Sequence, residues 1–346
     1  LSHTIIPLAL PKGTERFCEL CQKRAYLECT GCHVTFYCDE DHQQADWVGI
    51  HERICQLLIP IRTQTLSQTG RSEILYKKLI TICKSEAERK IAEGKHQEAL
   101  PAAQFFLRCS TDVNGPSAVQ LVPAYLLLAE ANTGLGDLVS AMEFLSQAEW
   151  VVLKSPDCGH EILHRLHRSQ GRLHTALGYL ESARKHFAND IYHASEEYGA
   201  DSIISCEGYF LLASVFVKEG KMPVVRSLYS QVKYNTYIMP HMYYFGHSVH
   251  TSFCLFFWQV EVDKTLTAIL EFVQCDVIAD LAQVVLVAHS LSMLWFLRGD
   301  SVKVSSVTEV VFDTVTQLHS EKSTATETTN ESTLCIHTLY HSLNKV

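Results

Sequence analysis

The stretch Cys18–Cys55 decides the fold of the N-terminal region: CELCQKRAYLECTGCHVTFYCDEDHQQADWVGIHERIC. Eight of its cysteines and histidines form four close pairs, with the spacings C-x2-C, C-x2-C, C-x3-H and H-x3-C. Gaps this short let both side chains of a pair turn back onto one ion, and tetrahedral zinc takes four sulfur or imidazole ligands. The stretch therefore predicts two zinc ions, held by Cys18, Cys21, Cys29, Cys32, Cys38, His42, His51 and Cys55.

The role of the metal follows from the size of the module and from the ligand count. A module this short buries too little apolar surface to fold alone, so zinc, worth ~10–16 kcal/mol per structural site, supplies its folding energy. Neither site keeps a coordination position open for water, which favours structural over catalytic zinc. A disulfide framework is the alternative, but such frameworks are typical of secreted chains. We expect the module to fold independently of the rest of the chain.

The ligand order, together with Tyr37, Gln43 and Asp46-Trp47, resembles the MYND zinc finger. Two departures are visible: His42 stands where most members have cysteine, and one extra residue separates His42 from His51. The resemblance implies a cross-braced finger over residues 17–55 with interleaved ligands. One zinc would then be held by Cys18, Cys21, Cys38 and His42, and the other by Cys29, Cys32, His51 and Cys55.

The same resemblance implies a peptide-binding surface. In MYND fingers that take proline-rich peptides, the groove is made by residues that match Thr30, Gln43 and Trp47 here, with serine usual at the first position. The alternative is that Trp47 caps the small core of the finger, because a buried indole is a large apolar side chain. Both interpretations of Trp47 stay open at this point.

Composition restricts the class of partner. The chain has 346 residues, 47% of them apolar, so it can bury a sizeable core. A net charge of −9 and a pI near 6.0 argue against nucleic acid. The longest apolar runs fall short of the ~20 residues that a membrane span needs. The cysteines outside the finger are scattered, as expected for reduced thiols in the cytoplasm. We expect protein partners, with no nucleic acid, membrane or small-molecule substrate.

A repeat follows the finger. Gly94, Gly136, Gly178 and Gly220 are each 42 residues apart, and small residues recur at two further positions of the same period. A glycine can end a helix in a left-handed turn, and small residues allow two antiparallel helices to cross closely. The pattern predicts helix hairpins and resembles tetratricopeptide repeats, whose usual period is about 34 residues. The small residues are Ala99, Ala141, Ala183 and Val225 in one series, and Ala87, Ala129, Gly171 and Ala213 in the other.

These observations predict a mainly α protein: a two-zinc finger followed by an α-solenoid of long helical hairpins. The expected boundaries are an extended lead-in at 1–16, the finger at 17–55, a docking linker at 56–70, repeats at 71–320 and a disordered Ser/Thr-rich tail at 321–346. We expect about six hairpins. The fifth would turn near Val262-Asp263-Lys264, which lacks the glycine, and the sixth near Arg298-Gly299-Asp300.

One motif is typical of an enzyme. His160-Glu161-Ile162-Leu163-His164 matches H-E-x-x-H, in which two imidazoles bind a catalytic zinc and the glutamate is the general base, and His167 falls on the same helix face. The segment starts a helix of the third repeat, and no third ligand stands in a family pattern. We therefore interpret it as a solvated helix start whose histidines bind metal adventitiously. Lysine methyltransferases with a MYND finger surround it with a SET domain, for which the chain has no room, and we expect no enzymatic activity.

A basic stripe is the candidate partner surface of the repeats. Arg165, Arg168 and Arg172 share one helix face, which lines the concave side in tetratricopeptide arrays, and guanidinium groups suit carboxylates of a partner. The alternative is a solvated face neutralised by Glu207. A clamp for the carboxylate tail of chaperones is disfavoured, because Glu88 stands where relatives carry asparagine.

The predicted function is a non-enzymatic scaffold or adaptor. The finger followed directly by repeats resembles ciliary and flagellar scaffold proteins, which implies a cytoplasmic and axonemal location and partners among dynein-associated and tetratricopeptide proteins. The alternative is a nuclear corepressor-type adaptor whose finger captures proline-rich peptides. A corepressor is expected to carry a basic localisation run, and no cluster of five or more Lys/Arg occurs in the sequence.

Overall fold

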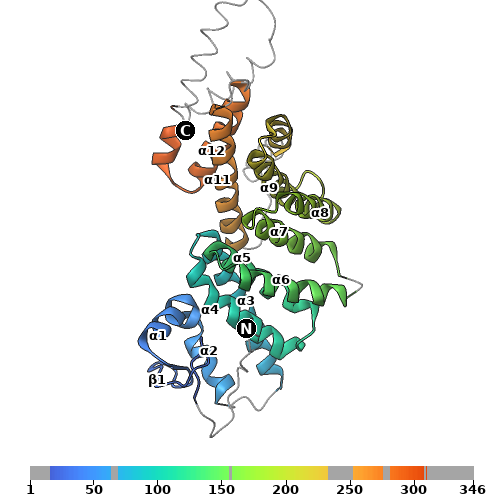
Figure 1. The fold of residues 1–346 in the computed structure, drawn as a ribbon. Helices are drawn as coiled ribbons and strands as arrows, with labels where there is room; N and C mark the ends of the chain where they lie inside the picture. Colours follow the sequence, from blue (N-terminus) through green and yellow to red (C-terminus); the bar gives the residue numbers. More distant parts are fainter. Residues whose placement is uncertain are drawn as a thin grey trace, which may run out of the picture. The chain divides into compact units, whose positions relative to one another are not determined.

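The computed structural model describes residues 16–63, 69–155, 158–232, 252–275, 281–307 and 309 (Figure 1). The chain divides into two compact units, Leu1–Glu197 and Tyr198–Val346. Most of the expected lead-in, residues 64–68 of the expected linker, the last part of the repeat region and the whole expected tail at 321–346 lie outside the described residues.

The finger combines a minimal sheet with a helical segment. Strands β1 (Leu27–Glu28) and β2 (Phe36–Tyr37) pair antiparallel, with Leu27 opposite Tyr37. Helix α1 (Glu40–Asp46) begins at Asp39, whose side chain accepts a hydrogen bond from the His42 amide, as an N-cap should. The π-helix η1 (Trp47–His51) and helix α2 (Glu52–Arg62) continue without a break. His51 and Cys55 therefore sit on a helix that runs out of the finger.

Three helix hairpins follow in the first unit. Each first helix ends just before a glycine with positive φ: Gly94 at 76°, Gly136 at 79° and Gly178 at 80°. The glycines that recur every 42 residues in the sequence thus lie at left-handed turns between helices. The prediction of a mainly α protein is confirmed. The hairpins are α3 (Thr69–Ala92) with α4 (His96–Asn114), α5 (Val122–Leu135) with α6 (Leu138–Leu153), and α7 (His160–Ala176) with α8 (Leu180–Tyr198); the 3-10 helix η2 (Val119–Leu121) precedes α5.

The small residues lie where paired helices approach each other. Ala99, Ala141 and Ala183 have no exposed surface. At Gly171 an added Cβ would lie 2.6 Å from the ring of Phe187, a fully buried side chain of α8. Larger side chains at these positions would push the helices of a hairpin apart, which explains the recurrence of small residues at this period.

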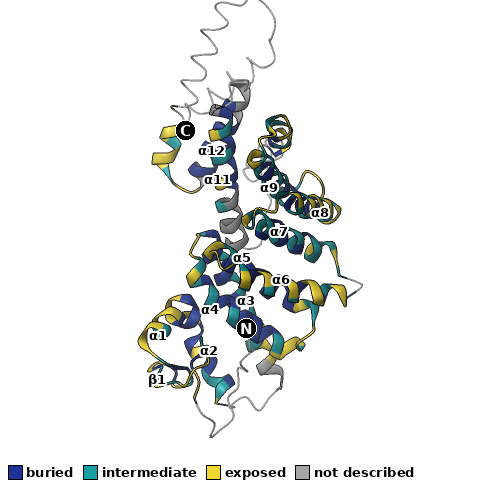
Figure 2. Cartoon of the chain, viewed as in Figure 1, coloured by how far each residue is buried: buried dark blue, intermediate teal, exposed yellow. Residues whose placement is uncertain are grey.

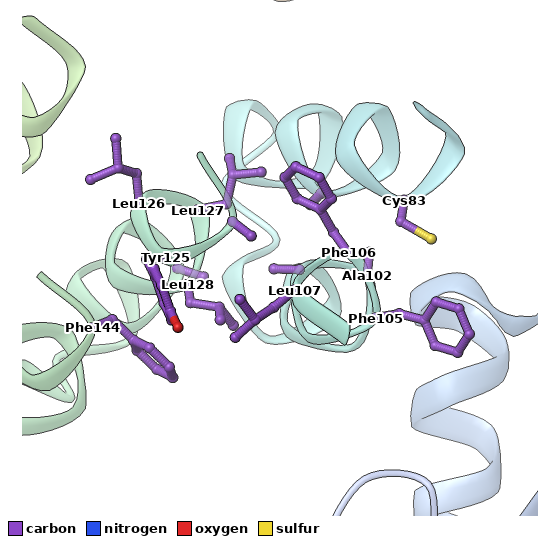
Figure 3. Close-up of a cluster of buried hydrophobic side chains, with 14 of the residues drawn as sticks. Cys83, Ala102, Phe105, Phe106, Leu107, Tyr125, Leu126, Leu127, Leu128 and Phe144 are labelled. Atoms are coloured by element: carbon purple, nitrogen blue, oxygen red, sulfur yellow. The ribbon is translucent and has the colours of Figure 1, made fainter. Parts of the chain in front are cut away.

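The finger and the first hairpins share one hydrophobic core (Figure 2). Ile50, Ile54 and Leu58 from η1 and α2 belong to the same buried cluster as Cys83 of α3 and Phe105 of α4. Figure 3 shows Cys83 and Phe105 on the side of α3 and α4 that is turned toward the blue ribbon of the finger. The backbone contact is equally close, because a Cβ on Gly49 would lie 2.6 Å from Pro101.

This core corrects one expectation and refines another. A finger that folds independently would expose Ile50, Ile54 and Leu58 to water, so the expected independence of the two modules does not fit the structure. Residues 56–62 of the expected docking linker are helical: they form the last two turns of α2, and Leu58 and Ile61 belong to the core shared with the hairpins.

The second unit contains helices α9 (Ile203–Lys218), α11 (Ser252–Cys275) and α12 (Leu281–Leu297), with further helical residues at 222–232 and 301–307. Gly220 and Gly299 have positive φ, as at the earlier turns. The turn expected near Val262-Asp263-Lys264 is wrong, because α11 runs straight through it. Asp263 instead accepts hydrogen bonds from Trp295 Nε1 (2.8 Å) and Arg298 Nη1 (2.9 Å). This segment has no glycine, and it lies within α11, where Asp263 contacts α12.

No helix within the described residues combines the length and apolar character that crossing a membrane requires.

Candidate metal centre and protein-binding surface

The first ligand cluster brings the turn at Cys18 and Cys21 together with the start of α1. Cys18 and Cys21 flank a tight turn, Cys38 follows β2, and His42 lies in the first turn of α1. The Cys21 and Cys38 sulfurs are 3.5 Å apart, and His42 Nδ1 lies 3.6 Å from Cys18 Sγ and 2.9 Å from Cys38 Sγ. All four ligand atoms lie within 4.8 Å of one another.

The second cluster lies deeper and interleaves with the first. Cys29 and Cys32 flank the turn between the two strands, whereas His51 and Cys55 come from the helical segment. The Cys29 and Cys55 sulfurs are 3.9 Å apart, and His51 Nε2 lies 3.6 Å from Cys32 Sγ. All four residues are buried, again with their ligand atoms within 4.8 Å of one another.

Both clusters fit zinc. With zinc–sulfur bonds near 2.3 Å, two ligands of a tetrahedral site lie about 3.8 Å apart, and a sulfur–nitrogen pair lies about 3.5 Å apart. Most of the distances above are close to these values, and a Cys3His donor set is a common structural zinc set. The finger therefore binds two zinc ions through two Cys3His clusters. His42 takes part through Nδ1 and His51 through Nε2, so the two histidines present opposite ring edges.

A buried carboxylate supports the second site. His51 Nδ1, on the far side of the ring from the cluster, lies 3.5 Å from Asp46 Oδ2, and the Tyr37 hydroxyl donates to that same oxygen at 2.6 Å. Burial, followed by the charge of Asp46, raises the pKa of Tyr37 far above its usual value, so the phenol stays a donor. Zinc-bound histidines commonly donate their second nitrogen to a carboxylate, which fixes the ring and its tautomer. The sequence alone predicts no role for Asp46, and its one signal is its place five residues before His51.

A second buried network ties the first zinc turn to the helices. The carboxylate of Glu19, between Cys18 and Cys21, lies 2.9 Å from Arg62 Nη2 of α2 and 2.6 Å from Arg108 Nη1 of α4. Arg62 Nη1 also donates to the Val34 carbonyl at 3.0 Å. This network is not predictable from the sequence, because no local pattern links residues so far apart in the chain.

The three candidate peptide-binding residues are accessible to different degrees. Thr30 is exposed, Gln43 is half-buried, and Trp47 is 38% exposed. The Trp47 ring lies 5.8 Å, centroid to centroid, from the ring of His51. The indole therefore lies beside a zinc ligand and is partly exposed, and Trp47 is not part of the finger's buried cluster.

The arginine stripe of α7 is paired with carboxylates of its own unit. Arg165 Nη2 lies 3.5 Å from Glu88, Arg168 Nε 2.8 Å from the buried Asp190, and Arg172 Nη1 2.5 Å from Glu130. These carboxylates come from α3, α8 and α5, and the expected neutralisation by Glu207 stays a prediction. Partner binding by this stripe stays a prediction.

Comparison with known proteins identifies the finger. Residues 18–55 match the family model of the MYND finger. A 65-residue segment is 35% identical to the Rho GTPase-activating protein gacZ of Dictyostelium discoideum, covering 19% of this chain and 6% of that protein. This chain thus spans a small fraction of that relative's length.

Among solved structures, BtubC (BKLC) from P. vanneervenii is similar at 15% identity over 67% of this chain and 92% of that chain, with a TM-score of 0.34, too low to define a shared fold. The family match and the two ligand clusters agree on the same residues. Residues 18–55 are a MYND zinc finger, a domain that mediates protein–protein interaction.

Proposed function

We propose that this protein is a non-enzymatic scaffold or adaptor whose MYND finger captures a partner while the first hairpins hold the finger in one orientation. The observation that carries the proposal is the double role of η1. Trp47 and Val48 of this segment are 38% and 42% exposed, whereas Gly49 and Ile50 pack on the helical hairpins. A partner bound at Trp47 would thus be rigidly connected to the array.

Two features support a protein without catalytic activity. Both zinc clusters have four protein ligands, which leaves no position for an activated water. The H-E-x-x-H motif is not arranged as a metal helix, because His164 is buried with Nδ1 3.4 Å from Asp190 Oδ1, while His160 contacts His193 instead. The histidines of the motif therefore do not converge on one ion.

The cellular setting is the finer part of the proposal. The order of finger and repeats resembles zinc finger MYND domain-containing protein 12, and this resemblance supports a cytoplasmic scaffold of the cilium or sperm flagellum with axonemal, dynein-associated and tetratricopeptide partners. A nuclear corepressor-type adaptor that binds proline-rich peptides is the alternative.

A capture experiment tests the proposal. Tagged protein, loaded with two zinc equivalents, is incubated with extract of ciliated tissue and separately with nuclear extract. We expect Trp47→Ala to lose the bound partners. Val48→Ala, an equally exposed neighbour on the same segment, is the matched control and should retain them.

The comparison of the two extracts distinguishes the axonemal role from the corepressor role. Partners from ciliated tissue that depend on Trp47 support the axonemal role, and Trp47-dependent capture from nuclear extract supports the corepressor alternative. Capture that is unchanged by Trp47→Ala would exclude the finger as the binding surface.

A further inference from the structure

Five histidines line the contact between α7 and α8, and we refer to them as the histidine seam. They recur every seventh residue, so each helix presents them on one face. Rings from the two helices alternate along the contact: His167 stacks on His193 with centroids 5.7 Å apart and an interplanar angle of 8°, and His174 lies 4.9 Å from His186. The seam consists of His160, His167 and His174 on α7 and His186 and His193 on α8.

Two pairs in the seam bring imidazole nitrogens face to face across the helices. His160 Nδ1 and His193 Nδ1 are 2.9 Å apart, and His167 Nδ1 and His186 Nδ1 are 3.2 Å apart. Two imidazole nitrogens bound to one metal ion at 2.0–2.1 Å lie about 2.9 Å apart at a right angle and about 3.4 Å apart in a tetrahedron. Both pairs fall in this range without any movement of the helices.

The two pairs differ in what else they contact. His167 Nδ1 also lies 3.1 Å from Gln170 Oε1, which competes for that nitrogen. At the other pair, the neighbouring aromatic ring is Tyr192, which meets His160 and His193 edge-on and offers no competing ring nitrogen. The His160–His193 pair is therefore the better chelate.

The protonation state of the histidine seam and its exposure to solvent both suit a bound cation. Burial lowers the pKa of His167, His186 and His193, so at neutral pH these rings keep the lone pairs that a metal needs. The carboxylate of Asp190 lies nearby on the same face of α8, where it pairs with Arg168. All five histidines are partly exposed, so a cation can reach this face from solvent.

We propose that the histidine seam binds a divalent transition-metal ion of the nickel, copper or zinc class at the His160–His193 pair, with His167–His186 as a second site. Imidazole suits these ions. In the described part of the chain, groups of three or more clustered ligands occur only in the finger, so water completes the coordination at the seam. Binding is weaker and more readily reversible than in the finger, and it joins α7 to α8 when the metal level rises.

Nickel titration of the full chain tests the proposal. Protein loaded with two zinc equivalents is titrated with Ni²⁺ by calorimetry, and its melting temperature is measured with and without the metal. We expect Ni²⁺ binding beyond the zinc and a raised melting temperature, because a ligand that binds only the folded state stabilises it. His160→Gln with His193→Gln should lose the tighter binding step and most of the shift.

Glu161→Gln is the matched control. It removes an exposed carboxylate next to His160 but no imidazole, and it should bind Ni²⁺ as the wild type does. Equal Ni²⁺ binding by the wild type and the double histidine variant would overturn the proposal, as would no binding by the wild type.

A measurement on unmodified protein guards against variants that fail to fold. X-ray absorption at the nickel edge reports only on the added ion. A nitrogen and oxygen shell with imidazole scattering supports the seam. A shell that contains sulfur would show that Ni²⁺ has replaced zinc in the finger, and it would overturn the assignment.

Discussion

Glu19 of the first zinc turn and Arg108 of α4, 89 residues apart in sequence, form a buried ion pair with Oε1 and Nη1 2.6 Å apart. Their side chains are only 7% and 6% exposed, and Arg62 lies on the same carboxylate oxygen. Burial by itself would raise the pKa of Glu19, but the guanidinium groups of Arg108 and Arg62 hold it at about 2. The zinc turn therefore carries a permanent negative charge that the helical array neutralises.

Glu19→Gln is expected to destabilise the whole first unit. The substitution removes the carboxylate that pairs with two buried guanidinium groups, and breaking a buried pair in this way costs about 3–5 kcal/mol. Urea denaturation followed by circular dichroism measures the loss. Glu28→Gln is the control, because Glu28 pairs with exposed Arg16 on the finger surface, where such pairs contribute about 0–1 kcal/mol. Equal effects of the two variants would contradict the structural role of Glu19.

Asp46→Asn should weaken the second zinc site selectively. The carboxylate behind His51 fixes the ring, and loss of such a partner typically lowers metal affinity 10–100-fold. Competition with a chromophoric chelator should show one weakened and one unchanged zinc. Asp39→Asn is the control, since asparagine retains the N-cap of α1 and His42 directs Nδ1 itself toward its cluster. Identical chelator curves for Asp46→Asn and wild type would rule out this role.

Loss of a zinc ligand should destabilise the first hairpins as well as the finger. Cys32→Ser removes a buried ligand of the second cluster. Because Ile54 and Leu58 of α2 pack in the core of the first hairpins, we expect faster amide hydrogen exchange in α3 and α4 as well as in the finger. Exchange confined to the finger would instead mean that the two parts unfold separately.

Gly171→Ala tests the close approach of α7 and α8. In an open helix this change stabilises by up to about 1 kcal/mol, but here the new Cβ would lie 2.6 Å from the buried Phe187 ring, and overpacking costs about 1–3 kcal/mol. We expect a net loss of stability in thermal melts. In a Phe187→Leu background the same change should cost less, because the smaller side chain leaves room for the methyl group. The absence of such coupling would place the glycine away from the ring.

The histidine seam should make the α7–α8 contact sensitive to acid when no extra metal is present. Burial and then the charges of His174 and His167 lower the pKa of His186 from 6.5 to about 4. A lowered pKa means that the unfolded state binds the proton more readily, so the contribution to stability is complete above pH 6.5 and is lost as the pH falls toward 4. The groups that face the seam include Asp190 and Glu149. Their negative charges partly offset the lowering of the His167 pKa by burial.

Hydrogen exchange of the α7 and α8 amides between pH 7 and pH 4 measures this loss after correction for intrinsic rates. His186→Gln removes the titrating ring and should flatten the pH dependence. Because the finger loses zinc in both proteins alike at low pH, a difference between the two reports on the seam. Equal profiles would exclude His186 as the source.

Local sequence patterns were sufficient for the finger's metal chemistry and for the helix hairpins. Zinc ligands lie close together along the chain, so spacing such as that of Cys29 and Cys32 carries the coordination rule. A glycine that ends a helix acts through its own backbone, and Gly94, Gly136, Gly178 and Gly220 all have the positive φ that their period predicted. Where the glycine was missing, at Val262-Asp263-Lys264, the expected turn was wrong and α11 continued.

Contacts between distant segments could not be read in this way. The pairing of Glu19 with Arg108, the shared core of Ile54 with Phe105, and the facing of His160 with His193 each depend on how helices pack, and packing depends on the fit of whole surfaces. A charged or aromatic side chain has the same local signature whether it is solvated or buried against a partner. The arginines of α7 illustrate this: their spacing predicted a stripe, but their counterions Glu88, Asp190 and Glu130 come from three other helices brought together by folding.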